Sequence, residues 1–241
     1  MFRHEYKYVI NKLEEYELIN RLSPIMKKDQ HTKNNDYYTV RSMYFDDCNN
    51  TCLKDVINGI SRRTKYRIRL YNHSNTYIAL EKKSKINNLT KKESCIVTKK
   101  QVEDILNNNI SIDDKNPKLL NELYTLILTK GYRPVIIIEY DRIPYVYENL
   151  VRVTIDRNIT CSYDISSFFN KKNMSYSVTD DNTSILEIKY GSILPDVIKY
   201  GVQINSLYRT SYSKYSNARL ITKDYIGGNL WVFQIFLKRI F

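Results

Sequence analysis

Hydrophobic and polar residues alternate along nine segments of this chain, and a period of two is typical of β-strands with one buried face. Between them, apolar residues recur at helical spacing, and capping pairs such as Asn11 with Glu14 precede two such segments. Helices that separate groups of antiparallel strands indicate an α+β fold. The predicted strands are residues 2–10, 37–46, 62–72, 76–85, 92–98, 132–142, 145–147, 150–157 and 184–190. The predicted helices are residues 12–22, 99–106, 117–130, 195–203 and 213–226.

Five of the predicted strands carry charged side chains at every second residue, with apolar or aromatic residues between them. In "KYRIRLY" (65–71), for example, the three basic residues share one face and Tyr66, Ile68 and Leu70 share the other. The cations on these faces are Arg3, Lys7, Lys65, Arg67, Arg69, Lys83, Lys85, Arg152 and Lys189. The anions are Glu5, Glu81, Asp156 and Glu187.

Two arrangements could place these charged faces. An antiparallel sheet commonly leaves one face to water, which explains any single strand. However, like charges at neighbouring positions of a sheet repel one another, and the opposite faces are apolar enough to require cover. Strands that close into a barrel, with helices packed outside and charge inside, satisfy both conditions. We therefore predict a barrel with a charged interior.

Composition supports a globular protein with an anionic partner. The 241 residues are 42% hydrophobic and contain no linker, repeat or low-complexity segment, so we expect one domain over residues 1–241. Lys and Arg number 38 against 26 Asp and Glu, a formal charge of +12. This excess favours nucleic acid, an anionic membrane surface or a phosphorylated small molecule.

The cysteines and the chain ends change this picture little. The four cysteines form no CxxC pair and the three histidines are scattered, so no zinc site is expected. No segment resembles a signal peptide, which predicts a cytoplasmic protein with reduced cysteines. The apolar run 230–241 is shorter than the roughly 20 residues that a membrane span needs. We expect it to dock on the core, although association with a membrane surface is compatible with its two basic residues.

A confined surplus of positive charge indicates which ligand the barrel would hold. Like charges in a poorly screened space repel strongly, and a bound polyanion would neutralise them. Guanidinium and ammonium groups bind phosphate oxygens, whereas carboxylates can approach phosphate only through a bridging cation such as Mg²⁺ or Mn²⁺. The pattern thus predicts a cage for a metal and a chain of phosphates.

The chain resembles a known family in segments that follow one another in a specific order. They are "RHEYKYVI", "VRSMYFDD", "KYRIRLY", "LEKKSK", "RPVIIIEYDR", "VRVTIDRNI", "ILEIKYG" and "SYSKY". Over residues 2–225 the chain resembles the VTC domain, the polyphosphate polymerase branch of the triphosphate tunnel metalloenzymes (the CYTH-like group). The resemblance implies an eight-stranded antiparallel tunnel with helices outside. It also implies transfer of the γ-phosphate of ATP to polyphosphate with Mn²⁺ or Mg²⁺.

The resemblance, together with the charged strand faces, defines a set of candidate site residues. The expected catalytic residues are Lys7, Arg67, Arg69, Lys83, Arg152 and Lys214. Further phosphate-binding residues are expected at Arg3, Lys65, Lys85, Arg142, Lys189 and either Lys91 or Lys92, with Lys91 preferred. The expected metal ligands are Glu187, Glu5 and Glu81. Arg142 shares a strand face with Ile136 and Ile138, so a bulge or a strand end should be needed to turn it inward.

Several alternatives stay open at this point. The same architecture could hydrolyse inorganic triphosphate, a nucleotide or thiamine triphosphate, or could bind polyphosphate without catalysis. A cyclase is less favoured because no adenine-binding motif is evident. Nucleic acid is not the expected partner, because no helix-turn-helix, RRM or zinc-finger signature is present. Asp46 could bind metal, Asp47 is expected in a turn or cap, and Tyr37, Tyr38, Tyr44 and Phe45 are expected to pack against outer helices.

Overall fold

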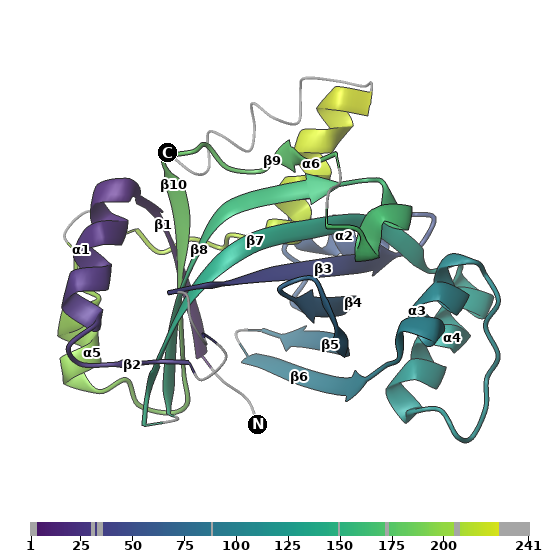
Figure 1. Ribbon diagram of the computed structural model, residues 1–241, viewed down its shortest axis with the longest axis horizontal. Coiled ribbons are helices and arrows are strands. Elements are labelled where there is room, and N and C mark those ends of the chain that lie inside the picture. Colours follow the sequence, from purple (N-terminus) through teal and green to yellow (C-terminus); the bar gives the residue numbers. More distant parts are fainter. Residues whose placement is uncertain are drawn as a thin grey trace.

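A strongly curved antiparallel sheet forms the body of the computed structural model (Figure 1). The structure describes residues 4–29, 32, 36–87, 89–148, 150–171, 174–204 and 208–226, with only the backbone for 222–226. Eight strands follow one another in the order β1-β10-β8-β7-β3-β4-β5-β6, while β2 pairs with β7 and β9 pairs with β8. The strands are β1 His4–Asn11, β2 Lys27–Lys28, β3 Tyr38–Asp46, β4 Arg62–Tyr71, β5 Ser74–Ile86, β6 Leu89–Ile96, β7 Arg133–Tyr147, β8 Val151–Ser162, β9 Tyr176–Ser177 and β10 Thr183–Tyr190.

Helices cover this sheet, and the sequence pattern predicts all of those described below except α2 and the 3₁₀ helix. Both expected capping boxes are present: the side chains of Asn11 and Glu14 cap the first helix, and those of Thr98 and Gln101 cap the third. The helices are α1 Lys12–Leu22, α2 Thr51–Ile57, α3 Lys99–Leu106, α4 Lys118–Lys130, α5 Asp196–Gly201 and α6 Lys214–Ile226, with a 3₁₀ helix at Ile165–Phe169. None of the helices in the described part of the chain is long and apolar enough to cross a membrane.

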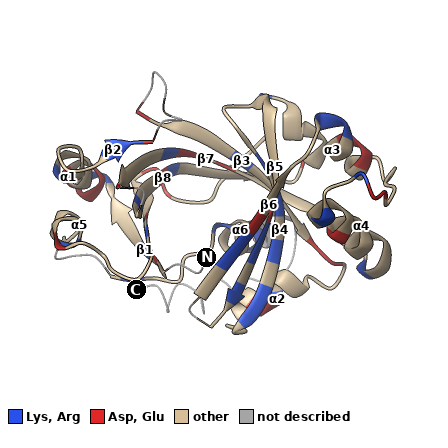
Figure 2. Cartoon of the chain, turned by 90° about the horizontal axis from the view of Figure 1, so that it is seen from below, with Lys and Arg blue, Asp and Glu red and all other residues tan. Residues whose placement is uncertain are grey.

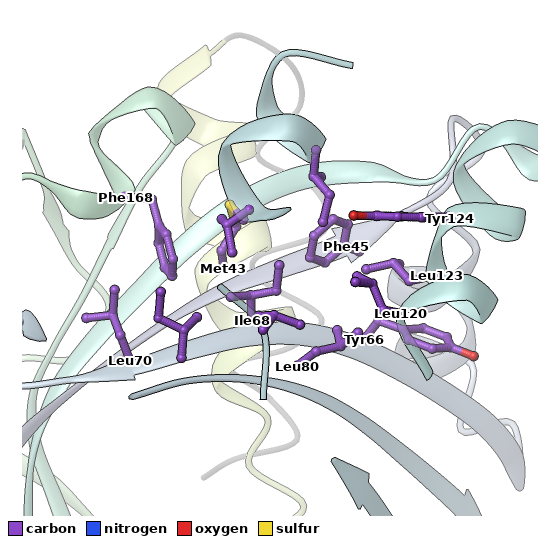
Figure 3. Close-up of a cluster of buried hydrophobic side chains, with 14 of the residues drawn as sticks. Met43, Phe45, Tyr66, Ile68, Leu70, Leu80, Leu120, Leu123, Tyr124 and Phe168 are labelled. Atoms are coloured by element: carbon purple, nitrogen blue, oxygen red, sulfur yellow. The ribbon is translucent and has the colours of Figure 1, made fainter. Parts of the chain in front are cut away.

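Two apolar clusters lie between the convex face of the sheet and these helices. In one, Ile68 and Leu80 of β4 and β5 pack with Leu120 and Leu123 of α4 (Figure 3). In the other, apolar residues of β1, β8 and β10 pack beneath α1 and α5. The apolar face of each alternating strand therefore points outward to a helix, and the charged face points to the concave side.

The concave face itself changes character along the strands. Ile136 and Ile138 of β7 lie on this face, where they pack with Tyr215 and Ala218 of α6 and with Leu53 of α2. These two helices therefore cover one end of the concavity with an apolar contact. The charged residues occupy the remaining length.

The expected closed barrel is not what the structure shows. The hydrogen-bonded path ends at β1 and β6, and within the described residues no ladder joins these two strands. Instead, the chain before α6 occupies the free edge of β1: Thr210 N–H donates to the Lys7 carbonyl at 2.9 Å, and Tyr8 forms a bridge with Arg209. The sheet is thus an open, curved one, and a different segment takes the place where barrel closure would occur.

The buried position of Ile68 allows a test of the packing. Its side chain is fully buried, so Ile68→Ala should lower the free energy of unfolding by about 3 kcal/mol, measured by urea denaturation. Ile96→Ala removes the same atoms from a side chain that is 63% exposed and should cost about 0.5 kcal/mol. Equal losses in the two variants would contradict the assignment of the convex face as the core.

Candidate active site

The charged strand faces line one cavity of about 520 Å³ on the concave side of the sheet. Figure 2 shows the sheet arching from β1 to β4, β5 and β6 around this space. Two carboxylates, Glu5 and Glu187, are among the lining residues. The basic lining residues are Lys7, Lys65, Arg67, Arg69, Lys83, Lys92, Arg142, Arg152, Lys189 and Lys214. Alternation therefore brings together most of the side chains that the sequence selected.

A second cavity of about 490 Å³ adjoins the first. The two share Glu5, Lys7, Lys65 and Lys83 in their lining. The second cavity is bounded by the segment 209–213 and adds three more basic residues, which are Arg63, Lys85 and Arg209. The basic lining thus continues beyond the first cavity, and Lys85 belongs to this continuation.

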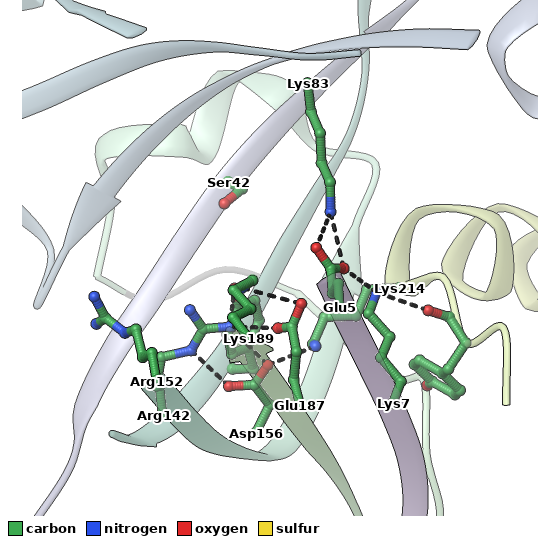
Figure 4. Close-up of polar contacts among 12 residues, drawn as sticks. Glu5, Lys7, Ser42, Lys83, Arg142, Arg152, Asp156, Glu187, Lys189 and Lys214 are labelled. Atoms are coloured by element: carbon green, nitrogen blue, oxygen red, sulfur yellow. Dashed lines mark hydrogen bonds and ion pairs between the residues drawn. The ribbon is translucent and has the colours of Figure 1, made fainter. Parts of the chain in front are cut away.

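Glu5 of β1 reaches across the opening between the edge strands β1 and β6 to Lys83 of β5. Its carboxylate accepts from Lys83 Nζ at 2.8 and 2.9 Å and pairs with Lys7 Nζ at 3.2 Å (Figure 4). Burial and the neighbouring Glu187 raise the pKa of Glu5, but Lys7 and Lys83 outweigh them and keep that pKa below its usual value. An ion pair therefore spans the gap that backbone pairing leaves.

Glu187 is the second carboxylate that faces the cavity. It pairs with Lys189 at 3.0 Å and with Arg142 at 3.5 Å. Burial raises the pKa of Glu187, yet Lys189, Lys7 and Arg142 together lower it well below its usual value. Glu187 is thus an anion among cations at neutral pH.

Asp156 does not line the cavity, but it pairs with two of the basic residues that do. It is fully buried, holds Arg142 Nε and Nη2 at 2.7 and 2.8 Å, and pairs with Lys214 at 2.6 Å (Figure 4). Burial raises the pKa of Asp156, whereas Arg142 and Lys214 lower it to about 2. The sequence placed Asp156 on a charged face, but only its two partners were among the expected site residues.

Arg142 corrects an expectation about local geometry. The pairing of β3 with β7 is regular from Tyr38↔Arg142 to Tyr44↔Ile136, so β7 keeps its alternation up to Arg142, which lies well inside the strand. The pairing of β7 with β8 does shift register between Glu139 and Asp141, but the extra residue lies in β8 and does not turn Arg142. Arg142 and Ile136 do share a face. Both point to the concave side. This is possible because the concave face is apolar where α6 covers it, at Ile136, and charged further along β7, at Arg142.

Glu81 differs from the other two expected metal ligands. It accepts from Arg67 Nε at 2.6 Å, lies 3.7 Å from Arg69 Nη1 and also pairs with Lys92. These three cations lower its pKa despite burial, and Glu81, unlike Glu5 and Glu187, is not among the residues that line the cavity. Glu81 thus has the position and contacts of a counter-ion to the lining arginines, and we favour Glu5 and Glu187 over it as metal ligands.

Glu5 and Glu187 fit a divalent cation better. Both are deprotonated and cavity-facing, they lie on the neighbouring strands β1 and β10, and Glu187 raises the pKa of Glu5. Within the described part of the chain, no three acidic, His or Cys side chains gather into a complete ligand set. Mg²⁺ and Mn²⁺ need only one or two carboxylates when phosphate oxygens and water supply the rest.

Tyrosine hydroxyls hold the arginines of the cavity in place. Arg67 donates to Tyr44 at 2.9 Å, and Tyr140 accepts from Arg69 and Arg142 at 3.2 and 3.3 Å. The expectation that Tyr44 packs against outer helices is therefore wrong, and so is that for Tyr38, which also lines the cavity. Tyr38 and Tyr44 are six residues apart, an even number, so strand alternation could have placed them together on the concave face.

Some expected residues lie elsewhere. Lys91 pairs with Glu93 at 3.5 Å and is absent from the lining, whereas Lys92 is cross-strand partner to Lys83 and lines the cavity. The preference for Lys91 is thus corrected, since neighbouring residues of a strand face opposite ways. Arg3 and residues 230–241 lie outside the described residues.

Asp46, Asp47, Phe45 and Tyr37 do not line the cavity, and their contacts stabilise the fold. Asp46 accepts from the backbone of Cys52 and Leu53 and from Tyr215, so it is not a metal ligand. Asp47 caps α2 through Thr51 N–H at 2.9 Å, as expected. Phe45 is in the core cluster beneath α4, and Tyr37 packs against the cluster beneath α1.

Comparison with known protein families assigns this chain to a family. A family model described as the VTC domain matches residues 2–223. This chain belongs to the VTC domain family. No curated protein matches the chain. The match covers every strand and nearly all of α6, so the cavity of this VTC domain lies wholly within it.

Several solved structures are similar to this VTC domain at low sequence identity. A candidate adenylate cyclase from Vibrio parahaemolyticus has a TM-score of 0.51 at 10% identity, covering 91% of this chain and 98% of its own. A candidate adenylyl cyclase from Hippeastrum with a dominant triphosphatase activity has a TM-score of 0.49 at 12% identity, covering 91% and 95%. A candidate adenylate cyclase from Bacillus halodurans has a TM-score of 0.47 at 13% identity, covering 98% and 100%.

The opposite orientation of Lys91 and Lys92 provides a matched test of the cavity. Each substitution by alanine removes one positive charge from β6, but only Lys92→Ala removes it from the lining. We expect Lys92→Ala to raise the Kd for inorganic tripolyphosphate about tenfold by calorimetry, because one charge-assisted contact is lost. Lys91→Ala should change the Kd by less than about twofold. Similar effects in both variants would contradict the assigned face.

Lys65 predicts a pH dependence of anion binding. It donates to Ser213 Oγ at 3.2 Å, and none of the described carboxylates pairs with it. Burial lowers the pKa of Lys65, and Lys7, Lys83 and Arg63 lower it further, to about 7. A bound anion favours the charged lysine. Above pH 7 binding must therefore take up a proton, and affinity should weaken as the pH rises.

The measurement compares tripolyphosphate affinity of the wild type with that of Lys65→Met between pH 6 and 9. The wild-type Kd should rise by up to about tenfold per pH unit above pH 7, and this part of the dependence should vanish in Lys65→Met. The protonation of tripolyphosphate itself is common to both proteins and cancels in the comparison. Parallel pH profiles would contradict the role of Lys65.

Proposed function

We propose that this VTC domain is a metal-dependent phosphoryl transferase that moves the γ-phosphate of ATP to a polyphosphate chain. The observation that carries the proposal is the charge of the cavity: ten Lys and Arg side chains line it, with Glu5 and Glu187 as the only lining carboxylates among the described residues. Positive charges still outnumber negative ones when Glu81 and Asp156, which pair with lining residues, are counted as well. A chain of phosphates would neutralise it.

Phosphoryl transfer depends on positioning and on neutralising charge on the transferred group. Arg67, Arg69, Lys83 and Arg152 come from β4, β5 and β8 and face one space. These four side chains would bind the non-bridging oxygens of the triphosphate. Because tyrosines and carboxylates already hold the guanidinium groups, little reorganisation would be needed when the substrate enters.

Glu187 and Glu5 would hold Mn²⁺ or Mg²⁺. When bound there, the cation would bridge carboxylate and phosphate and neutralise developing charge. Lys7, Lys189 and Arg142 surround the two carboxylates and keep them ionised at neutral pH. Glu81 would serve instead to orient Arg67 and Lys92.

The second basic cavity favours a polymer over a simple triphosphate as the occupant. Arg63, Lys85 and Arg209 extend the positive lining past the compartment that would hold the triphosphate. A hydrolase of triphosphate would use the first cavity and a metal-positioned water. An acceptor chain would also use the second.

Activity distinguishes these possibilities. Purified protein incubated with ATP and Mn²⁺ should produce a ladder of polyphosphate chains on a gel, with little free phosphate. Lys83→Ala and Glu187→Ala should each lower kcat at least about 100-fold, since each removes a charge at the reacting phosphates. Lys82→Ala is the matched control, because Lys82 pairs with Glu122 on the convex face and should retain activity.

Free phosphate without chain growth would support the hydrolase. Tight tripolyphosphate binding without any turnover would indicate a binding module. Full activity in both Lys83→Ala and Glu187→Ala would contradict the proposed site.

A further inference from the structure

The carboxylate of Asp29 contacts one wall of the candidate active site, and Asp29 belongs to the polar segment "KKDQHTKNN" (27–35). Asp29 follows the short strand β2, which pairs with the end of β7. Its N–H donates to the Pro144 carbonyl at 3.3 Å, and its own carbonyl accepts from Thr32 N–H at 2.9 Å. Only 7% of Asp29 is exposed. The β2–β7 pairing therefore fixes a buried carboxylate beside the sheet.

Asp29 pairs with an arginine of the cavity. Its Oδ2 lies 2.6 Å from Arg152 Nη2, and the same nitrogen donates to the Tyr38 hydroxyl at 2.8 Å. Both contacts hold one corner of the guanidinium. An ion pair with a buried, backbone-anchored carboxylate restricts a side chain that would otherwise have many rotamers.

The rest of the Arg152 guanidinium is left for a ligand. Its Nε is buried and has no hydrogen-bond partner among the described residues. Buried donors are nearly always paired, so an unpaired one in a cavity wall points to a missing acceptor. On β10, Lys189 is the cross-strand partner of Arg152, and repulsion between these two cations favours the binding of an anion beside them.

We propose that Asp29 is a positioning residue, which holds Arg152 so that Nε and Nη1 of its guanidinium face the phosphates. This inference rests on the proposed function, because it assumes that Arg152 binds substrate. The Asp29 carboxylate contacts Arg152 at Nη2, so a phosphate can bind the other guanidinium nitrogens without displacing Asp29. Asp29 itself is not a catalytic residue.

A double-mutant cycle tests this role. Asp29→Ala should raise the Kd for inorganic tripolyphosphate, or the KM for ATP, about tenfold, because Arg152 loses its orientation. Asp29→Asn keeps an acceptor oxygen and should have an intermediate effect. In an Arg152→Ala background, Asp29→Ala should have no further effect, since the two substitutions remove one interaction.

Glu15→Gln is the matched control. Glu15 is a buried carboxylate that pairs with Arg157 of the same strand β8 at 3.1 Å, but neither residue lines the cavity. It should lower the melting temperature without changing the Kd. Melting curves also show whether Asp29→Ala is folded, and Asp29→Asn provides the second variant if it is not.

The possible outcomes separate this inference from the proposed function. Additive losses in Asp29→Ala and Arg152→Ala would show that Asp29 does not act through Arg152 and would overturn the inference alone. Tighter binding by Asp29→Ala would show that the carboxylate competes with phosphate and would also overturn it. A wild type that binds no tripolyphosphate would instead remove the proposed function, and this inference with it.

Discussion

Repulsion between confined cations is the constraint on which the rest of this structure depends. Ten basic side chains line one cavity, and their mutual repulsion would be severe without nearby anions. Glu5, Glu81, Asp156 and Glu187 each contact at least two of these cations. Lys65 has no such partner among the described residues, and burial, together with repulsion from Lys7, Lys83 and Arg63, lowers its pKa. The carboxylates thus make the basic cavity compatible with folding, and the residual surplus makes it suited to polyanions.

The geometry that confines these charges does not require a closed barrel. Curvature of the antiparallel sheet brings β1 towards its other edge, where the ion pair between Glu5 and Lys83 of β5 spans the opening. The segment 209–213 covers the free edge of β1. Tyr215 and Ala218 of α6 fill the apolar end of the concave face. The open sheet, one segment and one helix together form the enclosure that the sequence pattern suggested for a barrel.

Strand alternation explains how much of the site the sequence could predict. Arg67, Lys83 and Glu187 could be placed together, because a period of two assigns each side chain to a face. The sequence could not decide whether Lys91 or Lys92 faces the cavity, because a shift of one residue in the strand register reverses the two faces. The contact between Asp29 and Arg152 could not be predicted from the sequence. It is a tertiary contact between residues more than 100 positions apart, and nothing in the residues around Asp29 indicates the partner. The prediction of a closed barrel was wrong for the same reason. Whether the two edge strands β1 and β6 pair depends on tertiary structure, which strand alternation does not reveal.

Ionic side chains from separate strands converge on one space, and the proposed function requires that this space binds phosphates. A crystal structure with a non-hydrolysable ATP analogue and Mn²⁺ would show where the phosphates bind. We expect phosphates in contact with Arg67, Lys83 and Arg152, with Mn²⁺ between Glu187 and a phosphate oxygen. An analogue bound on the convex face, or a cavity that stays free of phosphate at saturating concentration, would contradict this expectation.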